Sequence, residues 1–222
     1  MTAATSSRTT TLVGARYAES AFLRRMVWSY VAIWTLAALH PLDRETWLLE
    51  NGLVFVLAGV LVATHRRFAF SNLSYSQFFV FLVLHAVGSH YTYSLVPIGF
   101  TVQELFELDR NHYDRLVHLA FGLLFAYPLR ELMLRIVHLH RIWSYLGPPL
   151  AILALSSLYE IIESWAARLG DPELGIAYVG AQGDVWDGQK DMTLAFVGAI
   201  IAMGATAAWR WRTGREPYLA RR

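Results

Sequence analysis

The sequence predicts an all-α, polytopic membrane helix bundle with six transmembrane helices and both termini in the cytoplasm. The first observation is composition: 55% of the 222 residues are hydrophobic, only 16% are charged, and the mean hydropathy is +0.36. Such a chain is too apolar for an ordinary soluble domain. The second observation is six apolar stretches, each near the ~20 residues that a helix needs to cross ~30 Å of hydrocarbon. The third is the distribution of arginine between the connections.

The six expected spans follow one another without a soluble domain between them. The first is short but can be extended upstream through Phe22, and Pro128 predicts a kink in the fourth. The spans run from about Met26 to Leu39, Trp47 to Thr64, Phe78 to Val96, Asp114 to Leu134, Tyr145 to Ala166 and Met192 to Trp209. We therefore expect a cytoplasmic tail over 1–22, a transmembrane domain over 23–211 and a basic cytoplasmic tail over 212–222.

The basic residues assign an orientation to these spans. Fourteen of the nineteen precede the first span, follow the sixth, or lie in the connections after the second and fourth. By the positive-inside rule these segments are cytoplasmic. The alternate connections, which carry most of the acidic residues, are then expected to face outward.

Composition also excludes several functions. The chain has no cysteine, which rules out disulfides, thiol nucleophiles and cysteine-ligated metal sites. No basic block stands beside aromatic residues, so nucleic-acid binding is not expected. The polar, Ser/Thr-rich first twenty residues lack the apolar core of a cleavable signal peptide, and we expect the spans themselves to direct membrane insertion.

Two helical motifs could carry chemistry at the outer face. DRLVH opens the fourth span, and Asp114 and His118, four residues apart, share one face of a helix. They could chelate a cation or act as an acid/base couple; alternatively, Asp114 caps the helix and His118 contacts a neighbouring helix. YEIIE ends the fifth span and places Glu160 and Glu163 on one face, where two carboxylates require a cation or a basic partner. The alternative is a solvated helix end.

Two further segments are also predicted to lie near the outer boundary of the membrane. GAQGDVWDGQKDM begins at Gly180, and its glycines predict a loop rather than a continuous helix. Its Asp187 and Asp191 could be ligands or could only complement the dipole of the sixth span, and Lys190 adds a cation. His90 lies in the later half of the third span, and a lone histidine near the end of a span is more often structural.

Together these residues predict one site built from four helix ends. The candidate acid/base and catalytic residues are His90, Asp114, His118, Glu160 and Glu163. The candidate metal ligands are Asp114, His118, Glu160, Asp187 and Asp191, and a mixed His/carboxylate set suits Zn²⁺ or Mn²⁺, whereas all-oxygen coordination suits Mg²⁺. Arg110 and Lys190 are the candidates for binding an anionic headgroup.

The chain resembles a known family in motifs that occur in the same order. These are RRFAFSNLSY, GSHYTYSLVP, RNHYDRLVH, YPLRE, SSLYEIIES and GAQGDVWDGQKDM. They resemble the YjdF family of bacterial inner-membrane proteins, from about the second span to the end of the sixth, which implies a multi-pass protein of the inner membrane. DRLVH, YEIIE and the aspartates before the sixth span are more remotely similar to VanZ-like membrane proteins, which implies envelope chemistry by analogy only.

The leading functional hypothesis is a membrane-embedded, metal-dependent hydrolase or headgroup transferase that acts on a lipid or envelope substrate at the outer leaflet. A small-solute or proton transporter is the alternative, but it would place polar groups near the bilayer midplane, where only His85 is expected. A non-catalytic envelope or antibiotic-sensitivity protein, whose polar cluster only holds helices together, is the third reading.

Overall fold

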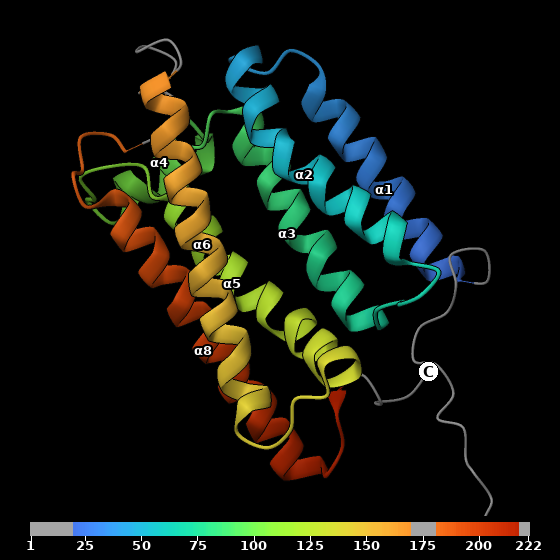
Figure 1. Ribbon diagram of the computed structural model, residues 1–222. Helices are drawn as coiled ribbons and strands as arrows, with labels where there is room; N and C mark the ends of the chain where they lie inside the picture. The colour runs from blue at the N-terminus through green and yellow to red at the C-terminus, as the bar shows by residue number, and fades with distance from the viewer. Residues whose placement is uncertain (1–19, 170–180, 218–222) are drawn as a thin grey trace, which may run out of the picture.

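The computed structural model describes residues 20–169 and 181–217, and this part of the chain is entirely helical (Figure 1). Seven α-helices and one short π-helical segment, η1, form a bundle. They are α1 (Ala21–Ala38), α2 (Arg44–Thr64), α3 (Asn72–His90), α4 (Pro97–Leu105), α5 (Tyr113–Leu132), η1 (Met133–Val137), α6 (Trp143–Leu169) and α8 (Asp187–Thr213).

Four helices are long and apolar enough to cross a membrane: α2, α5 with η1, α6 and α8. Many large apolar side chains point away from the protein, such as Leu36 and Val62 with 67% and 77% of their surface exposed. Exposed apolar surface of this extent is expected where lipid, not water, is the solvent. A multi-pass membrane protein is therefore confirmed, while the count of six spans and the orientation of the termini stay predictions.

The predicted helix positions are close to the observed ones, with two corrections. The third span was expected to reach Val96, but α3 ends at His90 and a separate short helix, α4, begins at Pro97. The segment before the sixth span was expected to be a loop up to Met192, but α8 already begins at Asp187. The turn that starts α8 is made by Asp184, whose side chain accepts a hydrogen bond from the backbone N–H of Trp186 at 3.1 Å. Gly180, most of residues 1–22, and residues 218–222 lie outside the described residues.

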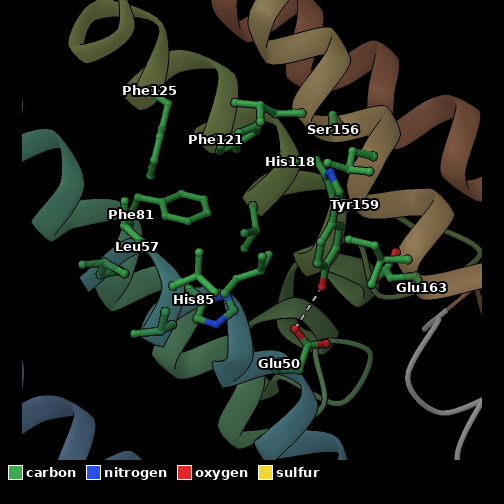
Figure 2. Close-up of a pocket in the computed structure, with 18 of the residues that line it drawn as sticks. Glu50, Leu57, Phe81, His85, His118, Phe121, Phe125, Ser156, Tyr159 and Glu163 are labelled. Carbon is green, nitrogen blue, oxygen red and sulfur yellow. Dashed lines mark hydrogen bonds between the residues drawn. The ribbon is translucent and has the colours of Figure 1, made fainter. Parts of the chain in front are cut away.

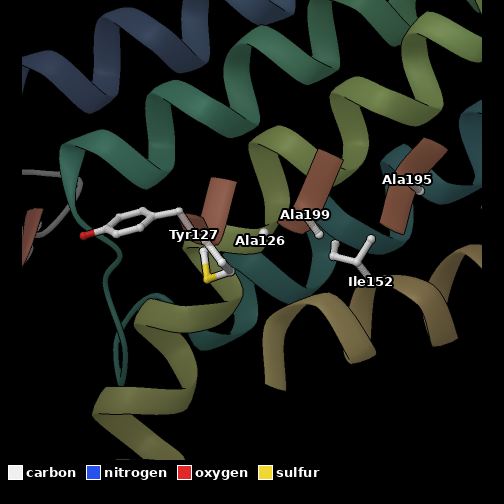
Figure 3. Close-up of a cluster of buried hydrophobic side chains, with 6 residues drawn as sticks. Ala126, Tyr127, Ile152, Ala195 and Ala199 are labelled. Atoms are coloured by element: carbon white, nitrogen blue, oxygen red, sulfur yellow. The ribbon is translucent and has the colours of Figure 1, made fainter. Parts of the chain in front are cut away.

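Helices α5 and α8 pack closely because both present small residues to each other. A Cβ atom added at Gly122 would meet the backbone carbonyl of Ala195, and one added at Gly198 would meet that of Leu119. Small residues at such crossings let two backbones approach closely in a membrane. A buried cluster formed by Ala126, Tyr127, Ile152, Ala195, Ala199 and Met203 continues this contact along α5, α6 and α8 (Figure 3).

The C-terminal end of α5 is stabilised by buried ion pairs. Glu131 is fully buried, accepts hydrogen bonds from the hydroxyls of Ser71 and Ser74, and pairs with Arg135. Arg130, also fully buried, pairs with Glu216 at 2.5 Å. The count of basic residues assigned Arg130 and Arg135 to the connection after the fourth span, but they lie on α5 and η1 and bind protein carboxylates.

The glycine packing predicts opposite effects for one substitution at two positions of α8. Alanine is favoured over glycine in a helix interior by ~1 kcal/mol, and nothing lies within 4 Å of a Cβ placed at Gly204. Gly204→Ala should therefore slightly raise the melting temperature in detergent. Gly198→Ala should lower it, since overpacking costs ~1–3 kcal/mol. Equal effects of both changes on thermal unfolding would contradict the close α5–α8 contact.

Candidate metal centre and adjoining cavity

The first turns of α5 and α8 and the later part of α6 bring four predicted site residues together at one end of the bundle. We call it the acidic end (residues 39–43, 91–112 and 181–186 with the adjoining helix turns). Asp114 and His118 lie one turn apart on α5, Glu160 lies on α6, and Asp191 lies on α8. The Nε2 atom of His118 is 3.6 Å from Oδ1 of Asp114 and 3.7 Å from Oε1 of Glu160. These separations exceed a hydrogen bond.

Asp114, His118 and Asp191 offer one ligand atom each, all within 4.8 Å of one another. Asp191 is only 2% exposed, and the side chains of Asp114 and His118 are 15% and 11% exposed. Oδ1 of Asp191 and Oε1 of Glu160 are buried and have no hydrogen-bond partner among the described residues. A buried carboxylate oxygen without a partner is costly, and a cation would satisfy it.

The donor set fits a divalent cation. One imidazole and several carboxylates suit Zn²⁺ or Mn²⁺, and the 3.6 and 3.7 Å separations from His118 are compatible with ligands ~2.1 Å from a shared ion. Gly188 helps to close the group, because a Cβ there would lie 2.6 Å from Oε2 of Glu160. Only a residue without a side chain lets α8 come this close to that carboxylate.

Asp187, the remaining predicted metal ligand, instead pairs with two arginine side chains. Its Oδ1 accepts from Nη1 of Arg110 at 2.5 Å and lies 3.4 Å from Nη2 of Arg115. The same Arg110 nitrogen donates to the carbonyl of Ala181 at 2.8 Å. These contacts join the connection before α5 to the start of α8. Arg110 was predicted to bind an anionic headgroup, and in the structure its guanidinium group binds Asp187 and Ala181.

Asp184 lies outside the spanning helices and completes a set of paired charges. We call this set the charged frame; its members are Arg110, Arg115, Asp184, Asp187 and Lys190. Asp184 binds Lys190 at 2.6 Å and also pairs with Arg115. The hydrogen bonds from Lys190, from the Trp186 backbone and from Arg115 hold the pKa of the Asp184 carboxyl well below its usual range. Lys190 is thus neutralised by protein, although 49% of its side chain is exposed.

The structure places His90 apart from this group. Its Nδ1 lies 2.8 Å from the carbonyl oxygen of Ala37 on α1, and the neighbouring backbone carbonyl of His90 accepts from Leu42. His90 therefore joins α3 to α1, and it does not line the cavity described next.

A cavity of about 340 Å³ adjoins the candidate metal centre, between α2, α3, α5 and α6 (Figure 2). Asp114, His118 and Glu163 line its polar end. Tyr159 crosses from α6 to α2 there, donating to Oε2 of Glu50 at 3.2 Å. Because Glu163 is only 8% exposed and lines this end, it is the predicted acid/base residue that the fold places beside the centre.

Glu50, His85, Tyr93 and Tyr159 were not among the predicted site residues, yet all four line the cavity. Glu50 is 3% exposed on α2, whose turns after Asn51 are apolar, and the hydroxyl of Tyr93 lies 2.5 Å from Nδ1 of His85. A carboxylate within an apolar span is a signal of function and could have identified Glu50. Tyr159 is the first residue of the YEIIE motif, but its contact with Glu50 depends on how α6 and α2 are placed in the fold.

The two kinds of ion pair at this end predict different costs of removal. Asp187→Ala leaves the buried Arg110 without its short carboxylate contact, and breaking a buried pair costs ~3–5 kcal/mol. Lys190→Ala removes an exposed pair worth ~0–1 kcal/mol. Thermal unfolding should show a large loss for the first variant and a small one for the second. If Asp187→Ala and Arg110→Ala added fully in the double variant, the pairing would be contradicted.

Comparison with known proteins agrees with this architecture. Residues 22–212 match the family described as "Predicted membrane protein (DUF2238)", so the match includes the first helix, which the sequence motifs left out. The chain is 39% identical over 188 residues to the "Inner membrane protein YjdF" of Escherichia coli (strain K12), covering 84% of this chain and 88% of that protein. No solved structure matches the chain.

The more remote similarity to VanZ-like proteins stays a prediction, but the inner-membrane, multi-pass character is confirmed. The chain belongs to the DUF2238 family of membrane proteins, and its similarity to YjdF supports the predicted resemblance.

Proposed function

We propose that this protein is a metal-dependent hydrolase or headgroup transferase that acts on a lipid or envelope substrate at the outer face of the inner membrane. One observation carries the proposal. Asp114, His118 and Asp191, none of them more than 15% exposed, bring their ligand atoms within 4.8 Å of one another, and Asp114 and His118 also line a largely apolar cavity. A purely structural cluster would be expected to satisfy its own oxygens, whereas Asp191 and Glu160 each keep a buried oxygen without a hydrogen-bond partner among the described residues.

A divalent cation bound there would polarise an ester or phosphoryl oxygen and make a bound water acidic. Asp114, His118 and Asp191 would hold it, with Glu160 beside them. Glu163, at the same end of the cavity, would accept the proton of the attacking water or alcohol and return it to the leaving group. Tyr159 and Glu50 would orient the polar part of the substrate.

The charged frame supports this arrangement by controlling the local charge. Arg110 and Arg115 neutralise Asp187 and Asp184, so these two carboxylates do not add to the negative charge at the centre. The carboxyl groups of Asp114, Glu160 and Asp191 lie around the single imidazole of His118, and this arrangement favours a bound cation over an uncompensated anionic substrate. The orientation with the acidic end outside follows from the distribution of arginine.

Metal analysis tests the proposal directly. Purified protein equilibrated with Mn²⁺ or Zn²⁺ and then desalted should retain roughly one cation per chain. The double variant Asp114→Asn, His118→Gln should retain none, because it removes charge and donor atoms but little volume. Glu160→Gln should weaken binding by ~10–100-fold, the usual cost of disturbing a neighbour of the ligands.

The matched control is His90→Gln, which changes a histidine of α3 that binds α1 and does not line the cavity. This variant should bind the cation as the unmodified protein does. Equal retention of metal by the Asp114/His118 variant and by the control would remove the proposed centre.

A further inference from the structure

The cavity beside the candidate metal centre is divided between a polar end and an apolar body. Its carboxyl groups gather toward one side, where Glu50, Asp114 and Glu163 lie with His118 and Tyr159. The other polar side chains of the lining are His85, Tyr93 and Ser156. The remaining wall is almost wholly aliphatic or aromatic. Apolar cavities of this kind stay dry and take apolar ligands, so a water-soluble substrate would leave most of this space unsatisfied.

The far end of the cavity is closed by aromatic rings. Phe81 on α3 and Phe125 on α5 lie with centroids 4.9 Å apart, and Phe121 is 4.9 Å from Phe125. Figure 2 shows these rings away from Glu50 and Glu163, beyond His85. The lining residues of α2 extend from Glu50 to Val60, which spans ~15 Å at 1.5 Å per residue. The space is therefore elongated along the helices.

One long side of the cavity faces outward between α2 and α6. Its lining residues on these helices are half exposed, such as Val56 at 63%, Val60 at 53% and Leu158 at 53%. By contrast, Val117 on α5 is only 5% exposed. Helix α2 packs on α3 while α6 packs on α5 and α8, so α2 and α6 stand on either side of this opening (Figure 1). In a bilayer, the opening meets hydrocarbon.

We propose that the cavity binds one hydrocarbon chain of a membrane lipid, which enters sideways between α2 and α6 and places the lipid's polar linkage beside Asp114 and His118. This inference rests on the proposed function and names its substrate class: an amphiphile whose reactive group is joined to a long apolar chain. The Tyr159–Glu50 hydrogen bond lies where the chain ends and the polar linkage begins. The chain runs toward Phe81 and Phe125.

Photolabelling of the full-length protein tests this inference. The probe is a phosphatidylglycerol with a diazirine at the end of one acyl chain, mixed into vesicles of phosphatidylethanolamine and phosphatidylglycerol. Peptide mapping should find the label on Phe81, Phe121 or Phe125. Val60→Trp, which adds bulk at the half-exposed wall, should reduce labelling roughly tenfold, equivalent to about 1.4 kcal/mol.

Two further variants make the result decisive. Leu155→Trp narrows the opening from the α6 side and should reduce labelling similarly, in case the α2 variant does not fold. Leu49→Trp is the control, because Leu49 is 48% exposed on the same helix as Val60 but does not line the cavity; it should label normally. Normal labelling of the folded Val60→Trp and Leu155→Trp proteins would overturn the inference.

Labelling at other places would also overturn it. A second apolar cavity of about 600 Å³ lies between α1, α2 and α3 and is lined by Tyr30 and Phe79. Label found there or on outward-facing residues alone would indicate only general lipid contact. Metal content is measured on the same preparations: retained cation with an unlabelled cavity rejects the chain site alone. A labelled cavity in protein that binds no cation instead rejects the metal-dependent function and leaves a chain-binding site.

Discussion

The close approach of α5 and α8 is the constraint on which the rest of the structure depends. Gly122 and Gly198 bring the two backbones together, and in a membrane such contact replaces the hydrophobic driving force that lipid cannot supply. Because the two helices cross so closely, Asp114 and His118 of α5 lie opposite the first turns of α8. The candidate metal centre is thus a consequence of small residues about one to two turns away from it.

The same contact gathers more carboxyl groups than basic side chains at the acidic end. Arg110 and Arg115 offset Asp187 and Asp184, and these pairs also anchor the connection before α5 to the start of α8. Asp191 and Glu160 keep buried oxygens without hydrogen-bond partners among the described residues. In a site from which water is largely excluded, a divalent cation is the simplest way to lower the cost of this arrangement.

The position of the cavity joins the chemistry of the centre to the membrane. Its polar end shares Asp114 and His118 with the centre, while its apolar body opens between α2 and α6. A lipid could therefore keep its chain in a hydrocarbon-like environment while its linkage reaches the carboxylates. A protein that handled a polar solute would have little use for the ring of phenylalanines that closes the far end.

Hydropathy and the spacing of residues within single helices determined the helical class, the membrane location, the approximate spans and the pairing of Asp114 with His118. These properties are local: a span needs enough apolar residues, and residues four apart share a face whatever surrounds them. Tertiary structure decided which groups meet across helices. It paired Arg110 and Lys190 with aspartates, placed His90 against α1, and brought Glu50 and Tyr159 to the cavity. Such partnerships depend on how each helix is rotated and how closely it packs, and at the α5–α8 crossing the glycine contacts between distant parts of the chain allow the close packing.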